Sequence, residues 1–371
     1  MTLRIATLVA LTLTSWSVLL RPLPADRAPI ALAEFGRMME SLSEPEGYFD
    51  TDNFVSNEAA YLRVLPAMRR IGLHGGAYLG VGPDQNYSYI AEIEPDIAVI
   101  IDIRRQNALE HLYFKALFQK SATRAAYLER LFGRRIRLGT ENPERASIGA
   151  LLDAAASAPR DPKLQAAMEA EAVTAIRGWS LPLKDSDFAA FDAIARAFME
   201  GGPELKFTSY NRAPRSYHPT LRQLLEETDG AAPANYLARE EKFRRLKVMH
   251  RENRIIPIVG DFSGPRAFQN VARELRRRGA AVRCFYASNV EFYLFRGERW
   301  DQYLRNLRGL PLESGACIIR SYANLGQPHP AQIPGYYMTT VLQRLDGFLR
   351  REAAGENQSY WDIVTRDCIL P

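Results

Sequence analysis

The sequence GGAYLGVGPDQNYSYIAEIEPDIAVIID, residues 75–102, predicts a strand, a glycine turn, a helix and a second strand in succession. Gly80 and Gly82 follow the first apolar stretch, where a Cβ atom would block the turn or the close approach of backbone N–H groups to a ligand. The run IAVIIDI, residues 97–103, is continuous, apolar and β-branched, as central parallel strands are. Asp102 closes this strand about twenty residues after the glycines, the spacing at which a carboxylate meets ribose hydroxyls. The stretch therefore predicts a Rossmann-like α/β unit with a ligand site at the sheet edge.

The third glycine of the dinucleotide fingerprint is missing, and Pro83 and Asp84 stand where the helix should begin. Pro83 suits a turn or a first helical position, and Asp84 or Asn86 can cap the helix. A second interpretation needs no ligand, since the glycines then make only a tight turn and Asp102 caps the helix that follows. The ligand interpretation makes Asp84 a candidate contact of the cofactor.

Two arginines, Arg104 and Arg105, come directly after this acid. Adjacent guanidinium groups at the carboxyl end of a strand can hold a carboxylate or a phosphate bidentately. Solvated arginines in the first turn of a helix, or ion pairs with Glu110, explain the same residues equally well.

The α/β pattern returns near residue 255, where two further strands end in polar residues. Asp261 closes the apolar run IIPIVG, and Ser288 and Asn289 close AVRCFYA. Ligands of open α/β sheets bind at the carboxyl ends of the strands, so these side chains are expected at the same crevice as Asp102. Glu291 and Tyr293 follow within one helical turn and are candidates to reach it. Helix capping by Asp261 and Asn289 is the alternative.

The remaining pattern predicts one folded domain over residues 30–371 with two β-α-β units around a helical insertion at about 133–254. Helices are predicted over residues 57–70, 107–132 and 265–278, and residues 43–57 are rich in turn formers and acids. The insertion is Ala-rich and charged, with Pro and Gly between its helical stretches. Its candidate ligand or partner contacts, which surface loops explain as well, are Arg212, Arg215, Tyr217, His218 and the acidic turn Glu226-Glu227-Thr228-Asp229.

An uncharged apolar stretch, residues 5–20, lies between Arg4 and Arg21 and has the shape of a signal peptide. Residues 1–29 are therefore predicted to be a signal peptide or a membrane anchor, with cleavage left open and a buried first helix as the alternative. The domain is accordingly expected to be exported, to the periplasm or the outside, or anchored by this segment. No other contact with a membrane is predicted.

Composition narrows the functional classes. The formal charge of +5 comes from 48 Lys and Arg against 43 Asp and Glu, which is no nucleic-acid signal. The three cysteines and five histidines are scattered without a metal-ligand spacing, so no metal is predicted. The chain has no G-x-S-x-G elbow and no G-K-[ST] phosphate loop, which argues against a hydrolase of that fold and against an NTPase.

Five strings carry a family resemblance: GGAYLGVGPDQNYSYIA, IIDIRRQNALEHLYFKALF, ETDG, VGDFSGP and FYASNVEFYLF. In them the chain resembles a largely uncharacterised family of bacterial proteins, often exported, related to a leptospiral protein with a class I methyltransferase-like fold. The resemblance covers roughly residues 42–322. It implies that Gly80 and Gly82 occupy the place of methyltransferase motif I and Asp102 that of the ribose-binding acid. It further implies that Asp261 meets the adenine edge and that Ser288 and Asn289 orient the methyl acceptor.

The first functional hypothesis is thus an S-adenosylmethionine-dependent methyltransferase with an unknown acceptor. Its candidate catalytic residues are Asn289, Glu291 and Tyr293, and its candidate cofactor-binding residues are Gly80, Gly82, Asp84, Asp102, Arg104, Asp261 and Ser288. The alternative is a non-catalytic exported module that binds another small molecule or a protein partner, because S-adenosylmethionine is a cytoplasmic metabolite. A dinucleotide-dependent oxidoreductase would share the glycines and the acid, but no pair of hydride-transfer residues is evident.

Overall fold

The computed structural model describes residues 28–213, 215–295 and 297–370. The predicted signal peptide or anchor, residues 1–29, therefore lies outside the described residues except for its last two. Within the described part, none of the helices combines the length and the apolar character that crossing a bilayer requires.

The core of the molecule is one six-stranded sheet with the order β3-β2-β1-β4-β5-β6. Neighbouring strands from β3 to β5 pair in parallel, and β6 pairs with β5 in the antiparallel sense. The strands are β1 (Ala77–Gly80), β2 (Ile97–Asp102), β3 (Ile255–Val259), β4 (Val282–Ser288), β5 (Leu312–Ala323) and β6 (Met338–Arg344). This arrangement confirms the predicted α/β class with a mainly parallel sheet.

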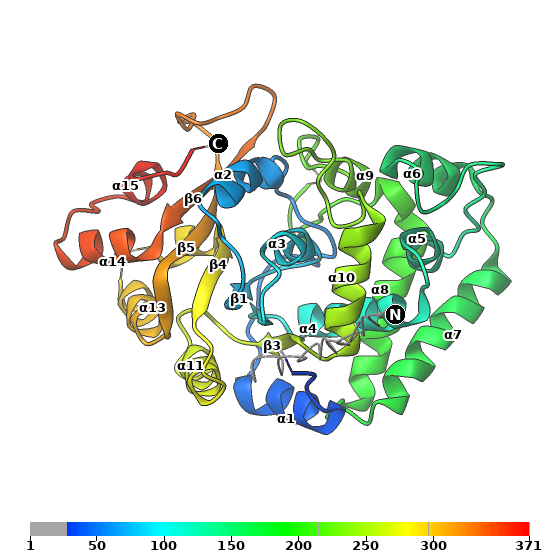
Figure 1. The fold of residues 1–371 in the computed structure, drawn as a ribbon, viewed down its shortest axis with the longest axis horizontal. Helices are drawn as coiled ribbons and strands as arrows, with labels where there is room; N and C mark the ends of the chain where they lie inside the picture. The colour runs from blue at the N-terminus through cyan, green and yellow to red at the C-terminus, as the bar shows by residue number, and fades with distance from the viewer. Residues whose placement is uncertain (1–27, 214, 296, 371) are drawn as a thin grey trace, which may run out of the picture.

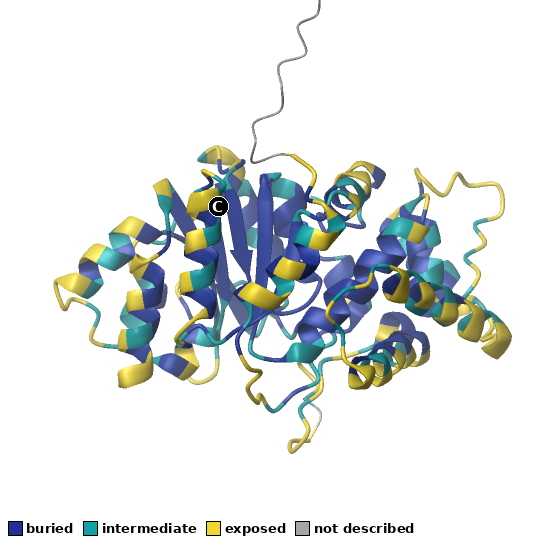
Figure 2. Cartoon of the chain, turned by 90° about the horizontal axis from the view of Figure 1, so that it is seen from below, coloured by how far each residue is buried: buried dark blue, intermediate teal, exposed yellow. Residues whose placement is uncertain are grey.

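Every residue of β1, β2 and β3 is buried, as Figure 2 shows by the dark strands between the helices. A strand covered on both faces can have apolar side chains at every position, which explains the unbroken apolar run of β2.

Helices cover both faces of the sheet (Figure 1). One face carries η2 (Tyr61–Val64), α2 (Leu65–Arg70), α3 (Gln85–Ile93), α4 (Arg105–Lys120) and α10 (Glu240–Arg251). The other carries α1 (Leu32–Leu42), α11 (Ala267–Arg277), α13 (Glu298–Arg308) and α14 (Leu345–Ala353). In α11 the buried residues Phe268, Val271, Ala272 and Leu275 recur at helical spacing and form a single apolar stripe toward the sheet.

The helix predicted over residues 107–132 forms as two helices, α4 and α5 (Arg124–Phe132). The chain is extended at Ser121, and Thr123 caps α5 by accepting a hydrogen bond from the N–H of Ala126 at 3.2 Å. The segment that follows packs on α4 and forms a helical lobe beside the sheet (Figure 1). Its helices are α6 (Ile148–Ser157), α7 (Pro162–Gly178), α8 (Asp185–Gly201), η3 (Gly202–Glu204) and α9 (Leu221–Leu225).

The C-terminal part contains three elements that the pattern did not predict: β6, α14 and α15 (Tyr360–Thr365). Strand β6 hydrogen-bonds along β5 from Met338 to Arg344 and places this edge of the sheet beside η2. The sheet thereby gains an antiparallel outer strand, which large parallel sheets often carry.

Candidate functional site

A cavity of about 350 Å³ lies at the carboxyl ends of the parallel strands. The chain continues from β1 to β2 and β3 on one side and crosses over to β4 on the other, so the topological switch point lies between β1 and β4. Ligands of open α/β sheets bind in this crevice. The predicted site residues that line the cavity are Gly82, Asp102, Arg104, Asp261, Ser288, Asn289 and Tyr293.

Gly80 acts on the glycine turn from outside the cavity. A Cβ atom at this position would come within 2.0 Å of Asn86 Oδ1. The Asn86 side-chain amide donates hydrogen bonds to three successive carbonyl groups of the turn, those of Val81, Gly82 and Pro83. Gly80 is therefore required for the packing of the residue that shapes the turn, and the prediction that it contacts a ligand directly is corrected.

Gly82 lines the cavity with φ at +81°, a conformation that other residues rarely adopt. Its carbonyl oxygen lies 2.9 Å from Nε2 of His111, so this ring nitrogen carries the proton and donates. Burial lowers the pKa of His111 to about 4, and in the neutral ring Nδ1 accepts from the Tyr87 hydroxyl at 2.7 Å. A buried histidine thus fixes the turn without adding charge.

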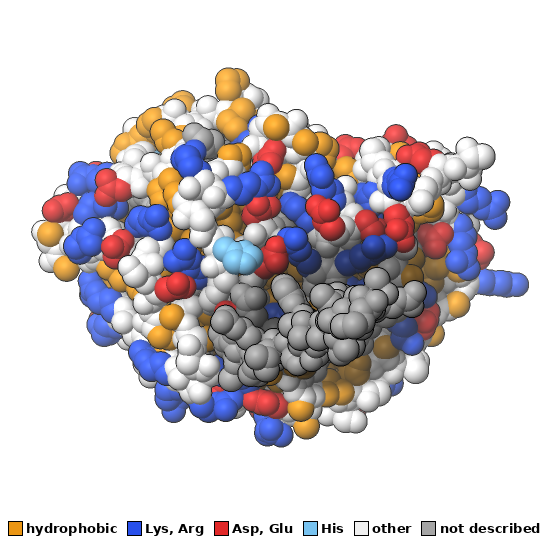
Figure 3. Space-filling view, viewed as in Figure 1, with side chains coloured by type: hydrophobic (Ala, Val, Ile, Leu, Met, Phe, Trp, Pro, Cys, Tyr) orange, Lys and Arg blue, Asp and Glu red, His pale blue; other side chains and the backbone are white. Residues whose placement is uncertain are grey.

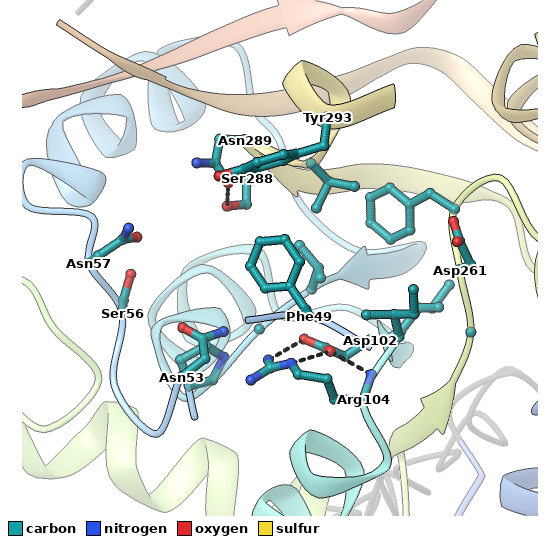
Figure 4. Close-up of a pocket in the computed structure, with 18 of the residues that line it drawn as sticks. Phe49, Asn53, Ser56, Asn57, Asp102, Arg104, Asp261, Ser288, Asn289 and Tyr293 are labelled. Carbon is teal, nitrogen blue, oxygen red and sulfur yellow. Dashed lines mark hydrogen bonds and ion pairs between the residues drawn. The ribbon is translucent and has the colours of Figure 1, made fainter. Parts of the chain in front are cut away.

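Asp102 and Arg104 form a closed pair at the floor of the cavity (Figure 4). Arg104 Nε and the Arg104 backbone N–H donate to Asp102 Oδ1 at 3.0 and 2.9 Å, and Nη2 donates to Oδ2 at 2.8 Å. The third guanidinium nitrogen donates to the carbonyl oxygen of Asp52 at 2.8 Å. Arg104 is therefore engaged by the protein itself, as the ion-pair alternative expected, although its partner is Asp102 and not Glu110. Arg105 is bound bidentately by Asp187 of α8 at 2.7 and 2.6 Å.

Asp261 lies on the wall formed after β3. Its Oδ1 accepts hydrogen bonds from the backbone and the hydroxyl of Ser263, both at 2.8 Å, which closes a turn and does not cap a helix, because α11 begins only at Ala267. Its Oδ2 accepts from Arg299 of α13 at 2.8 Å. Asp261 thus lines the cavity as a carboxylate with its charge already paired.

Glu58 is a carboxylate of the cavity wall that the sequence pattern did not reveal. Three hydroxyl groups donate to it, from Tyr286 at 2.6 Å, from Ser288 and from Ser321, and no described cation pairs with it. Burial raises the pKa of Glu58, and the three hydroxyl hydrogen bonds oppose that rise. Ser288 adopts φ of +54°, unusual for a non-glycine residue, at the end of β4. We call Glu58 with these three hydroxyl groups the hydroxyl cage.

Glu58 was missed because a helix was predicted from residue 57. Ala60 is left-handed, with φ at 64°, and helical structure begins only at Tyr61. The preceding loop therefore turns its polar residues toward the cavity. Wall residues from this loop are Tyr48, Phe49, Asn53, Ser56, Asn57 and Glu58. The available signal was the polar run SNE, residues 56–58, shortly before the apolar helix.

Two other predicted site residues lie away from the cavity. Asp84 is buried and accepts a hydrogen bond from Tyr236 at 2.9 Å, and burial raises its pKa to about 6. Glu291 is fully buried and forms an ion pair with Arg320, while the Tyr303 hydroxyl donates to it at 2.7 Å. Both residues are corrected from site residues to parts of the packed interior.

A second cavity of about 370 Å³ adjoins the first. Five residues line both: Phe49, Asn57, Phe207, Asn289 and Tyr293. The rings of Phe49 and Tyr293 meet edge to face with their centres 5.3 Å apart. The two cavities therefore share a wall at the place where the N-terminal loop meets α12 (Val290–Leu294).

The predicted contacts in the helical lobe divide between this second cavity and the surface. The second cavity is lined by Arg212, Arg215 and His218. The ring of Tyr217 contacts that of Tyr337 in a tilted arrangement, with ring centres 4.3 Å apart. The acidic turn lies elsewhere. Glu227 forms an ion pair with Arg63, and Asp229 forms one with Arg69, so the turn holds η2 and α2 in place.

Within the described residues, no three His, Cys, Asp or Glu side chains gather as a group suited to a metal ion. Figure 3 shows Lys and Arg side chains interspersed with Asp and Glu over the face that it presents. A mixed charge pattern of this kind is ordinary for a protein surface.

The comparisons with known proteins give one result. No curated protein matches the sequence. A family profile described as "Domain of unknown function (DUF7790)" matches residues 53–141 and 176–366, which include the glycine turn, both strand-end acids and the hydroxyl cage. Because the match covers well over half of the chain, the protein belongs to the DUF7790 family.

Proposed function

We propose that this protein is an S-adenosylmethionine-dependent methyltransferase that acts on a small-molecule acceptor. The observation that carries the proposal is the pair of adjoining cavities with a shared wall at the switch point. A group transfer between two molecules needs two binding places in contact, and catalysis then consists largely of holding the reactants in position. The first cavity would hold the cofactor and the second the acceptor.

The residues of the first cavity fit an adenosyl ligand. Gly82 presents open backbone, since a Cβ atom there would meet only Asn53 Nδ2, at 3.6 Å. Gln85 Oε1 is buried and has no hydrogen-bond partner among the described residues, so it can accept a hydrogen bond from a ligand. Asp102 Oδ2 accepts one hydrogen bond and retains capacity for a hydroxyl group.

The hydroxyl cage favours a ligand that carries positive charge. Glu58 is 1% exposed and no described cation pairs with it, whereas Asp102 and Asp261 are each paired with an arginine. A buried carboxylate without a cation is costly, and a cationic group in the cavity would stabilise it. S-adenosylmethionine supplies an electrophilic methyl group on a positively charged sulfur.

The fold is consistent with the same proposal without requiring it. The strand order, the parallel pairing and the antiparallel outer strand suit a Rossmann-like fold, and the family resemblance points to the methyltransferase class among such folds. Fold alone does not establish function, so the proposal depends on the two cavities and the charge of Glu58.

A second candidate function is a non-catalytic module that binds another ligand. The closed Asp102–Arg104 pair favours it, because three of the acceptor positions of this carboxylate are already used. An exported chain, as the N-terminal segment predicts, would also be separated from cytoplasmic S-adenosylmethionine. This candidate predicts no adenosyl binding.

The test is a calorimetric titration of the purified full-length chain with S-adenosylmethionine and S-adenosylhomocysteine. We expect saturable binding that Asp102→Asn weakens by about tenfold or more, since a neutral amide accepts hydrogen bonds less strongly than a carboxylate. Asp346→Asn is the matched control, because Asp346 is exposed and its contacts among the described residues, with Arg350 and the backbone N–H of Gly347, lie within α14. Thermal unfolding checks that both variants are folded. No binding at millimolar ligand would contradict the proposal and favour the second candidate.

A further inference from the structure

We propose that the second cavity binds a flat aromatic molecule that carries a carboxylate group. The class of ligand follows from the walls of the cavity, and its role as methyl acceptor rests on the proposed function. Binding itself does not depend on that function.

The walls present aromatic rings from widely separated parts of the chain. Among them are Phe49, Phe207, Phe292, Tyr293, Tyr322 and Tyr337. Phe292 and Tyr293 are 59% and 49% exposed, although they lie on a helix with a buried side. Large aromatic side chains are seldom left exposed together without a binding role. Rings favour flat, conjugated ligands because they pair with them edge to face or offset.

The positive charge in the cavity comes from two arginines, Arg212 and Arg215. Arg212 Nε lies 3.6 Å from Asp50 Oδ2, so this guanidinium has a carboxylate partner. Arg215 donates to the Tyr217 hydroxyl and lies over that ring at 5.7 Å, and it forms no ion pair with a described carboxylate. Its charge is close enough to oppose protonation of His218 and to favour ionisation of Tyr337. Arg215 is thus a half-buried cation in a wall of the cavity, with no anion paired to it among the residues that the structure describes.

Polar groups around Arg215 define the anion further. Burial lowers the pKa of His218, which keeps the ring neutral near pH 7. Asp50 lies in the same wall and disfavours a doubly charged group such as a phosphate monoester. The buried hydroxyl of Tyr360 has no hydrogen-bond partner among the described residues and can serve a polar ligand atom. A singly charged carboxylate on an aromatic ring meets all of these conditions.

The test uses 2-naphthoate, its neutral analogue 2-naphthamide and the saturated decahydro-2-naphthoate, titrated by calorimetry into the full-length chain without cofactor. We expect 2-naphthoate to bind about tenfold more tightly than the amide, because hydrogen bonds to charged groups are the stronger ones. The saturated acid should bind more weakly than the aromatic acid.

Three variants assign this preference to Arg215. Arg215→Gln should remove the preference for the carboxylate by weakening 2-naphthoate binding more than 2-naphthamide binding, and Arg215→Lys should retain part of the preference. Arg273→Gln is the control, since Arg273 is exposed on α11 and its described hydrogen bond is to Asn270 on the same helix. Equal binding of acid and amide, a preference that survives Arg215→Gln, or no binding of either probe would overturn the proposal.

The result is separable from that for the first cavity. If the wild-type chain binds S-adenosylmethionine but does not prefer 2-naphthoate to 2-naphthamide, only the proposal that the acceptor is an aromatic carboxylate is rejected. Intact naphthoate binding without S-adenosylmethionine binding would reject only the methyltransferase.

Discussion

Glu58 and Glu291 are both buried glutamates on the same half of the sheet, with 1% and 0% of their surface exposed, but their surroundings differ in charge. Glu291 is paired with Arg320, whose Nη1 also donates to Gln343 at 2.6 Å and whose guanidinium lies over Phe348 at 4.2 Å. The Glu58 carboxylate accepts its described hydrogen bonds from hydroxyl groups alone, and it borders a cavity.

Burial alone therefore does not distinguish a functional carboxylate from a structural one. Both glutamates lose hydration in the folded state, and only Glu291 regains that free energy from a cation of the protein. The lack of a cation at Glu58 among the described residues and the adjacent cavity are together the reason why we propose a ligand there. Neither feature can be read from the local sequence of the two residues.

The largest expected effect is on folding. Glu291→Gln should lower the free energy of unfolding by about 3–5 kcal/mol, because it leaves the buried charge of Arg320 without a carboxylate to pair with. Urea unfolding followed by circular dichroism measures the loss, with the exposed Asp346→Asn as the control. A loss below about 1 kcal/mol would show that Glu291 is not the structural carboxylate of the pair.

Asp84 shares one of the two features of Glu58 and lacks the other. It is buried with no described cation paired to it, but it does not line the cavity. Its pKa is about 6 in the folded protein against 3.8 ordinarily, so the folded state binds more protons than the unfolded state between these values. The contribution of Asp84 to stability should therefore fall as pH rises from about 4 to 6, by up to about 3 kcal/mol at 1.36 kcal/mol per pKa unit.

Asp84→Asn keeps an acceptor for Tyr236 and lacks the titration. The difference in unfolding free energy between this variant and the wild type should increase across that pH range and then become constant. A difference that does not change with pH, measured by urea unfolding from pH 4 to 7.5, would refute the assignment.

The smallest effect in free energy is the most specific. Glu58→Gln should weaken S-adenosylmethionine binding about tenfold, or about 1.4 kcal/mol, and change S-adenosylhomocysteine binding little, because only the former carries a positively charged sulfur. The hydroxyl groups of the cage can rotate to accept from the new amide, so the variant should fold. Calorimetry gives the ratio of the two affinities, and an equal effect on both ligands would remove Glu58 as the partner of a cation.

Sequence reasoning recovered the parts of the fold with strong local signals. Three such signals lie within short stretches of sequence. They are the apolar run of β2, the amphipathic pattern of α11 and the polar residues at the ends of β3 and β4. The antiparallel strand β6 was missed, although MTTVLQR contains β-branched residues, because its partner β5 supplies the hydrogen bonds and the burial.

The sequence by itself determined the parallel sheet, its glycine turn and the placement of Asp102, Asp261, Ser288 and Asn289 at one edge, because strand direction and periodicity are local properties. Only the tertiary structure decided which charges are free. Arg104 binds Asp102, Arg320 binds Glu291, and Glu58 and Arg215 have no described ion-pair partner. Charge compensation acts through space between residues far apart in the chain, so it becomes visible only when the fold has brought them together.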